Sequence, residues 1–169
     1  RIFEGTNEIN RLFIPTTLLR RAQKGRFQLP TKMAEHAAPS PAAAPLDQAA
    51  VLLRGAKQAT LWLTGIAVKK FGDGLVEQQE VLAALSDMTI EIFLDESALL
   101  RTQKAIAAGR PAGAMTDLTL SLMNDSVSRM EQRGALALAA CLTGDDLQNS
   151  LANLRRLLAW TPLNVVELR

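Results

Sequence analysis

The chain has 169 residues and a formal net charge of +2, with Lys and Arg interspersed among acidic and apolar residues. This distribution excludes a dedicated nucleic-acid surface, which would show a basic stripe or arm. Hydrophobic residues make up 48% of the sequence and aromatic residues only 4%, and the excess is Leu and Ala, so we expect an almost wholly helical protein with a sizeable core.

The first predicted helix covers about residues 7–23. Thr6 is placed to cap this helix, and Glu8 in its first turn complements the positive end of the helix dipole. Pro15 removes one backbone donor and clashes with the preceding turn. We therefore expect Pro15 to kink or split the segment, with a second helix from Thr16 onward.

A linker follows, because the helical periodicity stops and residues 26–45 become rich in Pro, Ala, Ser and Gly. Four further helices are predicted after it, separated by Gly and Pro signals. They cover about residues 46–71, 75–108, 115–143 and 145–158. Asp145 is placed to cap the last of them. The predicted fold is all-α: a bundle of about four long antiparallel helices, preceded by a short helical segment and the linker.

The two central helices show the seam of a bundle. Their apolar or small residues recur at intervals of three, four and seven, the spacing of helix faces that pack together. The seam positions are Leu85, Met88, Ile92, Leu99 and Ile106 in one helix, and Leu120, Met123, Val127, Met130, Gly134, Ala137 and Cys141 in the other. Gly134 and Ala137 would let a neighbouring helix approach closely. Cys141 is expected to be a buried small residue rather than a nucleophile.

Two features of the predicted bundle leave alternatives open. Asp95 falls in the apolar seam, so its carboxylate either points to a rim or pairs with a basic residue such as Arg129 or Arg133. The last helix carries an amphipathic face that either completes the core, which we favour, or contacts a membrane surface or a partner. Its members are Leu147, Leu151, Leu154 and Leu158, beside Arg155, Arg156 and Trp160. No apolar run approaches the roughly 20 residues of a bilayer crossing, so any membrane contact would be peripheral.

The most specific pattern is the string Phe3-Glu4-Gly5-Thr6-Asn7, which runs straight into the first predicted helix. It resembles the catalytic-base segment of the flavin-dependent acyl-CoA dehydrogenases, which has an aromatic residue, the base Glu, and then Gly-Thr-Asn. The detailed resemblance covers about the first 25 residues, and Phe3 stands where many members carry Tyr. The remainder resembles more loosely the very-long-chain branch, which appends a linker and a helical domain to the catalytic core.

The resemblance implies a role for each residue of this segment. Glu4 is the base that removes the proton next to the thioester carbonyl of an acyl-CoA, and its backbone N–H also polarises that carbonyl. Gly5 lies where backbone and substrate meet closely, for which the lack of a Cβ is a physical reason. Thr6, Asn7 and Glu8 match the positions that the family uses around FAD, where a helix start suits a phosphate or ribose.

The resemblance also implies a longer parent protein. Residues 1–25 would be the C-terminal end of a catalytic domain, 26–45 the linker, and 46–169 an appended helical bundle. Because little of a flavin site or acyl cavity is present, we expect a C-terminal piece that is inactive on its own. The parent would bind acyl-CoA, pass electrons to an electron-transfer flavoprotein and form homo-oligomers. The alternative is that the bundle is an interaction, oligomerisation or membrane-docking module without catalysis of its own.

Metal and hydrolase chemistry lack the residues they need. The only histidine, His36, lies in the linker, so the chain cannot build a His-rich zinc site, a Glu-x-x-His di-iron bundle site or a Ser–His nucleophile pair. The resemblance leaves flavin chemistry as the expected activity. It places the parent in the cytoplasm or, in a eukaryote, in the mitochondrion, with a peripheral position at the inner membrane as an alternative.

Overall fold

The computed structural model describes residues 7–30, 40, 43–162 and 164. Five α-helices and one 3-10 helix make up this part of the chain, and it contains no strand. Their bounds are α1 (Asn7–Gln23), α2 (Pro45–Phe71), η1 (Gly72–Glu77), α3 (Gln79–Ala107), α4 (Gly113–Cys141) and α5 (Gly144–Leu157). The predicted all-α class is confirmed.

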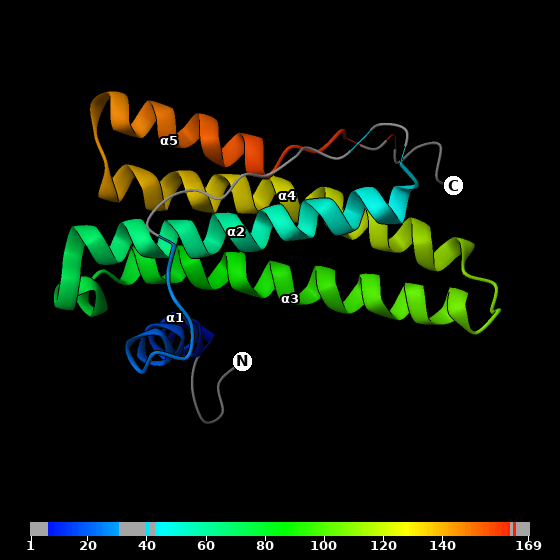
Figure 1. The fold of residues 1–169 in the computed structure, drawn as a ribbon, viewed down its shortest axis with the longest axis horizontal. Coiled ribbons are helices and arrows are strands. Elements are labelled where there is room, and N and C mark those ends of the chain that lie inside the picture. The colour runs from blue at the N-terminus through cyan, green and yellow to red at the C-terminus, as the bar shows by residue number, and fades with distance from the viewer. Residues whose placement is uncertain (1–6, 31–39, 41–42, 163, 165–169) are drawn as a thin grey trace.

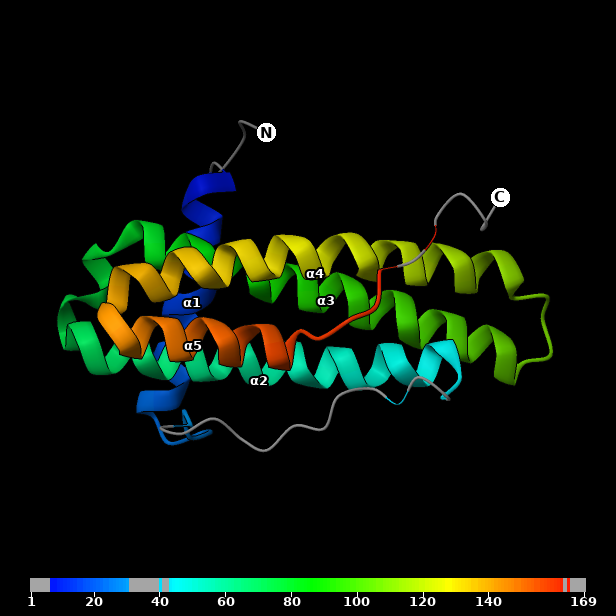
Figure 2. The ribbon, with the colours of Figure 1, turned by 90° about the horizontal axis from the view of Figure 1, so that it is seen from above.

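The helices α2, α3, α4 and α5 run in alternating directions as an antiparallel bundle (Figure 1). Three of them are long, with 27 residues in α2 and 29 each in α3 and α4, whereas α5 has only 14. The bundle therefore has three long helices rather than the four expected, and α5 covers one end of the face formed by α2 and α4. Outside the bundle, α1 runs across α3, as Figure 2 shows from above.

The bundle core lies along the seams that the sequence predicts. Every predicted seam position of α4 is buried, and so are Leu85, Met88 and Leu99 of α3. Ile92 is half-buried and packs against this core. The exception is Ile106, which is exposed in the last turn of α3, where α3 and α4 extend past the start of α2 (Figure 1). Cys141 is a buried free cysteine, and burial raises the pKa of its thiol, as expected of a core residue.

The leucine face of α5 closes the core. Leu154 and Leu158 are buried, while Leu147 and Leu151 pack partly buried against the core. Gly134 of α4 makes room for Leu154, because a Cβ on Gly134 would lie only 2.7 Å from Leu154 Cδ2. The close helix approach expected at Gly134 is confirmed. The interpretation of the leucines of α5 as core residues is also confirmed.

Pro15 does not split α1, which runs unbroken through Asn7–Gln23. The proline ring is buried, and no other residue of this helix is. The hydroxyl of Thr16 donates to the carbonyl oxygens of Leu12 (2.9 Å) and Phe13 (3.0 Å), in the turn that lacks the proline N–H. Packing and these local bonds hold the helix together, so the expected split is wrong.

Two helix starts also differ from those expected. The segment after α2 forms the 3-10 helix η1, and α3 begins only at Gln79, because Leu75 of η1 turns inward and is buried. At the start of α5, Thr143 rather than Asp145 occupies the cap position. Asp145 lies in the first turn instead, where its carboxylate complements the positive end of the helix dipole. Each difference is confined to about one turn of helix.

Asp95 is buried between α3 and α4 and takes neither of the two arrangements expected. Its Oδ2 accepts a hydrogen bond from Ser126 Oγ at 2.5 Å, while Oδ1 has no hydrogen-bond partner among the described residues. The two arginines expected to reach it pair instead with other carboxylates of α3. Burial raises the pKa of the Asp95 carboxyl from 3.8 to about 6, against the opposing effect of the Ser126 hydrogen bond.

The chain after α1 crosses the surface of α2. A Cβ on Gly65 of α2 would lie 2.5 Å from the carbonyl oxygen of Pro30, so only glycine lets the two backbones approach this closely. The first described part of the predicted linker, residues 26–30, therefore lies against the bundle at this point. Together with Leu12 and Leu19, which pack against the core, this crossing fixes α1 at both ends.

Candidate functional site

The predicted catalytic segment leads into the start of α1. Glu4, Gly5 and Thr6 lie outside the described residues, so their roles stay predictions. Asn7 and Glu8 belong to the first turn of α1, and both are exposed. The structure therefore describes two of the five residues assigned to catalysis or binding. Both lie in the first turn of α1, and the other three directly precede this helix in the sequence.

A polar depression of about 460 Å³ lies beside this end of α1. Three helices form its walls. The lining residues are Asn7, Glu8 and Arg11 of α1, Asp87, Ile90 and Glu91 of α3, and Arg129, Gln132 and Arg133 of α4. Charged groups of both signs line it, so this site is a network of ion pairs rather than an apolar cavity. In this depression Asn7 and Glu8 lie beside residues of α3 and α4, which are distant from them in the sequence.

Asp87 of α3 ties the start of α1 to the bundle. Its Oδ2 accepts a hydrogen bond from Arg11 Nη2 at 2.5 Å and lies 3.0 Å from Arg133 Nε of α4. The Asp87 side chain is only 19% exposed, which shields these pairs in part from solvent. One carboxylate therefore joins three helices, and it holds α1 within one turn of Glu8.

A second ion pair lies in the same depression. Arg129 donates to Glu91 through both Nε (2.6 Å) and Nη2 (2.9 Å), a forked arrangement that fixes α4 to α3. The hydrogen bonds that Arg129 donates to Glu91 raise the pKa of the Arg129 guanidinium above its ordinary value, so the guanidinium stays charged. Sequence reasoning missed these acceptors. Arg11 and Asp87 are 76 residues apart, and no local pattern connects them.

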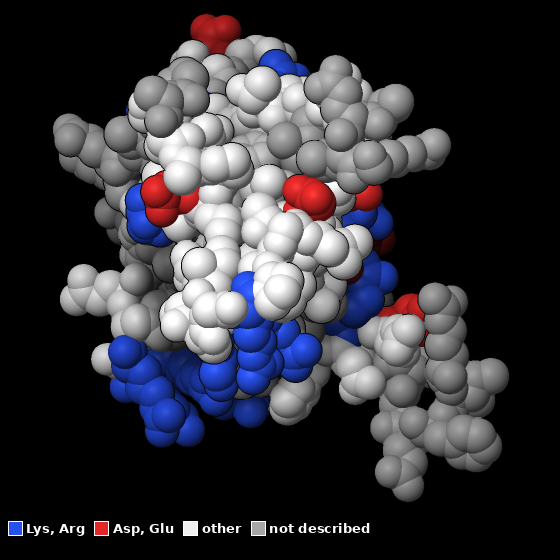
Figure 3. Space-filling view, turned by 90° about the vertical axis from the view of Figure 1, so that its right-hand side faces the viewer, with Lys and Arg blue, Asp and Glu red and all other residues white. Residues whose placement is uncertain are grey.

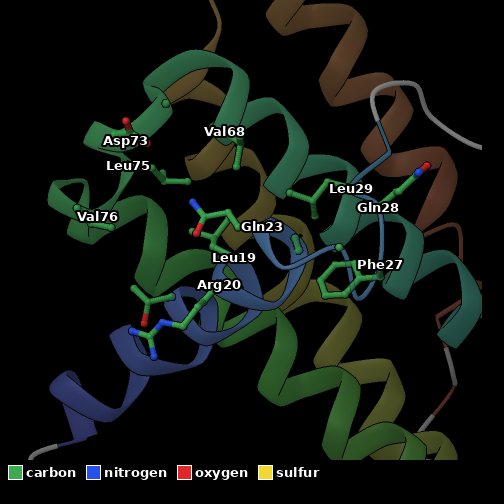
Figure 4. Close-up of a pocket in the computed structure, with 14 residues that line it drawn as sticks. Leu19, Arg20, Gln23, Phe27, Gln28, Leu29, Val68, Asp73, Leu75 and Val76 are labelled. Atoms are coloured by element: carbon green, nitrogen blue, oxygen red, sulfur yellow. The ribbon is translucent and has the colours of Figure 1, made fainter.

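A larger cavity of about 730 Å³ lies near the opposite end of α1. It is enclosed by α1, the segment after it, α2 and η1 (Figure 4). Leu19, Val68 and Leu75 give it apolar walls, and Gln23 points into it. This cavity marks the junction of α1 with the bundle. It could not be anticipated from the sequence, because only the tertiary fold brings η1 beside the end of α1.

Two of the three residues predicted to contact FAD, Asn7 and Glu8, belong to the described part of the chain. Asn7 and Glu8 are exposed at a helix start, whose free N–H groups and side chains can bind a phosphate or ribose oxygen. In the described part of the chain, no group of three or more His, Cys, Asp or Glu side chains converges as metal ligands would. None of the helices described here is long and apolar enough to cross a membrane.

Comparisons with known proteins point to one family. The model of a family described as acyl-CoA dehydrogenase, C-terminal domain, matches residues 55–156. A Bacillus subtilis (strain 168) protein described as a probable acyl-CoA dehydrogenase is 36% identical over 99% of this chain, which is 30% of that protein. The crystal structure of an acyl-CoA dehydrogenase complexed with FAD from Bacillus anthracis matches 99% of this chain and 28% of that one, with 35% identity and a TM-score of 0.86. This chain thus spans less than a third of the length of these relatives, and it belongs to the acyl-CoA dehydrogenase family through its C-terminal domain.

Proposed function

We propose that this chain is the C-terminal part of an FAD-dependent acyl-CoA dehydrogenase of the very-long-chain branch, with Glu4 as the catalytic base. The observation that carries the proposal is the position of the motif: Phe3-Glu4-Gly5-Thr6-Asn7 leads directly into α1, and Asp87 holds the first turns of that helix. The FAD in the Bacillus anthracis relative supports the choice of cofactor.

The proposed reaction is the desaturation of an acyl-CoA to the trans-2-enoyl-CoA. The Glu4 carboxylate takes the proton from the carbon next to the thioester carbonyl, and the electron pair left behind forms the double bond as a hydride leaves the neighbouring carbon. Bound FAD supplies the hydride acceptor. The backbone N–H of Glu4 donates to the carbonyl oxygen, and Gly5 lets the substrate lie against the backbone.

The cofactor contacts proposed for this chain come from Thr6, Asn7 and Glu8. The exposure of Asn7 and Glu8 at the start of α1 supports this role, because a ligand can reach both side chains. The parent would then pass the two electrons to an electron-transfer flavoprotein, as part of fatty-acid β-oxidation. The isolated chain would be inactive, because the catalytic base needs a complete flavin site and acyl cavity around it.

The bundle would act as the support of the catalytic segment. Asp87 holds Arg11, which is seven residues after Glu4 in the sequence, and Pro15 is buried against the bundle. A base works only when it lies within hydrogen-bond reach of the proton it removes, so the direction in which α1 presents its start matters for the rate. This support role is a reason to favour the enzyme over a free-standing docking module.

The alternative function is a helical interaction, oligomerisation or membrane-docking module. A deletion separates the two: a parent that ends at Lys32 keeps its turnover if the bundle only docks, and loses flavin or fails to fold if the bundle supports the catalytic part. We expect the loss, because the described helix α1 packs on the bundle through Leu12, Pro15 and Leu19. We further propose a homo-oligomeric parent in the cytoplasm, or in the mitochondrion of a eukaryote, with a peripheral position at the inner membrane as the alternative.

The first test is the intact mass of the natural polypeptide, which must be several times that of this chain. The test of the base is Glu4→Gln in that polypeptide. This variant should still bind acyl-CoA but fail to bleach the flavin under anaerobic conditions, because the amide cannot accept the proton. Glu77→Gln, an exposed residue of η1 far from the motif in sequence, serves as the matched control and should bleach normally. Normal bleaching by Glu4→Gln would contradict the assignment.

A further inference from the structure

A third cavity, of about 740 Å³, lies between α2 and α5. It is at the end of the bundle where α2 stops and α5 begins (Figure 1). Its volume falls in the range of small-molecule sites, which is about 300–1,000 Å³. Four parts of the chain line it: the segment after α1, the second half of α2, the end of α4 and the first two turns of α5. Neither Asn7 nor Glu8 does, so this cavity is separate from the contacts proposed for FAD.

The inner side of this cavity is apolar. Trp62 of α2 and Cys141 of α4 line it and are only 7% and 6% exposed, so they form its buried wall. The half-buried apolar residues beside them are Leu29, Ile66 and Leu142. Such a wall favours a ligand with an apolar body, because each CH₂ group that leaves water contributes about 0.8 kcal/mol.

The mouth of the cavity carries two cations. Lys69 and Lys70, in the last turn of α2, are exposed, and neither has an ion-pair partner among the described residues. Burial raises the pKa of the Cys141 thiol, and the ammonium group of Lys70 opposes this effect, which places Lys70 near the apolar wall. The negative end of the α2 dipole accounts for cations in this turn, but not for an apolar cavity beside them.

The charges that line this cavity do not balance. Its one carboxylate, Asp146 in the first turn of α5, forms no ion pair with either lysine. Two cations and one carboxylate leave one positive charge. In the cavity near the end of α1, Arg20 is balanced by Asp73, and the depression beside the start of that helix has three arginines and three carboxylates. Of these three cavities, only the one between α2 and α5 has a charge that a single anion would neutralise.

Basic side chains also lie where no such cavity accompanies them. Lys and Arg gather on the lower side of the opposite end of the bundle, below a largely uncharged region (Figure 3). Arg101 and Lys104 on the last turns of α3 are exposed at this end, and neither lines any of the three cavities. Lys104 therefore serves as a control for attraction by charge without an apolar wall.

We propose that the cavity between α2 and α5 binds a monocarboxylate with an apolar body, such as a medium-chain fatty acid. The carboxylate lies at Lys69 and Lys70, and the apolar body lies along Trp62 towards Cys141. One carboxylate neutralises the lining, whereas a nucleotide or a coenzyme A group brings phosphates with several negative charges. The site does not rest on the proposed function, because none of its residues belongs to the catalytic segment.

Photoaffinity labelling of the natural polypeptide tests the proposal. The probe is a dodecanoic acid with a diazirine at the end of its chain, used below its micellar concentration, and peptide mass spectrometry locates the label. We expect saturable labelling of the peptides that contain Trp62 and Leu142, and an excess of decanoate should prevent it. The matched probe is the alcohol with the same chain and diazirine. It should label these peptides about tenfold more weakly, because it lacks the charge that the lysines bind.

Substitutions of the exposed charges sharpen the test, because they leave the apolar core intact. The double variant Lys69→Gln, Lys70→Gln should weaken labelling by the acid about tenfold, whereas Asp146→Asn should strengthen it about threefold by removing the opposing carboxylate. Lys104→Gln should leave it unchanged. Circular dichroism verifies that each variant keeps its helices.

Absence of label from the peptides of the cavity would overturn the proposal. Equal labelling by the acid and the alcohol would also overturn it, and so would labelling that the charge variants leave unchanged, because the cavity would then only adsorb apolar molecules. The result is separable from that for the base. Charge-dependent labelling together with normal bleaching by Glu4→Gln keeps this site and removes the proposed catalytic residue.

Discussion

The two outer helices, α1 and α5, attach to the same three long helices in different ways. α5 is amphipathic: its leucines close the core, and Arg155 and Arg156 remain exposed. α1 carries exposed apolar side chains on its outer side, and its start is held by the ion pairs of Asp87. The apolar face of α5 is therefore taken up by the bundle core, whereas α1 leaves two large apolar side chains, Ile9 and Phe13, exposed in this chain.

The contacts that α1 and α5 make with the bundle also differ. Leu154 of α5 fits the space left by Gly134 of α4. In α1, the buried atoms Arg11 Nε and Thr17 Oγ1 have no hydrogen-bond partner among the described residues, and neither does Ser86 Oγ of α3. An unpaired buried polar atom costs about 1–3 kcal/mol. The contact of α5 is therefore apolar and complementary, whereas the contact of α1 combines the apolar Leu12 and Leu19 with ion pairs and with buried polar atoms that lack a partner among the described residues.

The largest effect is expected from removing the apolar contact of α5. Leu154→Ala should lower the free energy of unfolding of the chain by about 3 kcal/mol, because Leu154 is fully buried and the deletion leaves a cavity over Gly134. Phe13→Ala, the matched change on α1, should cost less than about 0.5 kcal/mol, because Phe13 is exposed in this chain. Urea unfolding measures both values, and equal costs would contradict the contrast between the two helices.

A smaller change, which raises the free energy of unfolding, is expected from substituting Asp95. The buried carboxylate of this residue destabilises the long helices to which α1 and α5 attach. Its folded pKa of about 6 lies above the ordinary value of 3.8, so the stability linked to this carboxyl is full below about pH 4 and is lost as the pH rises through 6. Asp95→Asn keeps an acceptor for Ser126 and removes the charge. It should stabilise the chain by about 2 kcal/mol at pH 7.5 and by almost nothing at pH 4.

Urea unfolding at several pH values checks this difference. The exposed Asp125 of α4 provides the control, and Asp125→Asn should change stability by less than about 0.5 kcal/mol at any of these pH values. A difference between wild type and Asp95→Asn that does not grow with pH would show that Asp95 is not a buried carboxyl with a raised pKa.

The helices of the bundle could be predicted because their signals are local. The seven-residue spacing of Leu120, Val127, Gly134 and Cys141 predicted the buried face of α4, and all four are buried. Such periodicity follows from burial of one helix face against a neighbour, whichever neighbour that is. The same logic identified the leucine face of α5 as core. Local patterns therefore sufficed for which residues turn inward.

The attachment of α1 could not be predicted, because it depends on partners distant in the sequence. The rule that proline splits a helix failed at Pro15, which is buried within the unbroken helix α1. No sequence signal joined Arg11 to Asp87. Of the candidate site, the sequence supplied the motif and the exposed residues Asn7 and Glu8, while the charged depression beside them came only from the tertiary fold.

The smallest effect that still separates the two helices is expected from their ion pairs. Asp87→Asn should lower the free energy of unfolding by about 1 kcal/mol, because this partly buried carboxylate serves both Arg11 and Arg133. The matched change is Glu131→Gln, which removes the partner of Arg155 at 2.9 Å. That pair between α4 and α5 is largely exposed, and its loss should cost less than about 0.5 kcal/mol.

Hydrogen exchange of the backbone amides shows which helix each substitution destabilises. Asp87→Asn should speed exchange of the backbone amides of α1 selectively, because the ion pairs hold that helix, whereas Glu131→Gln should leave α5 protected, because Leu154 still anchors it. Faster exchange in α5 after Glu131→Gln would mean that both outer helices depend on charge. If only α1 loosens, the position of the catalytic segment depends on one carboxylate of the bundle, and Asp87→Asn in the natural polypeptide should slow flavin reduction without weakening acyl-CoA binding.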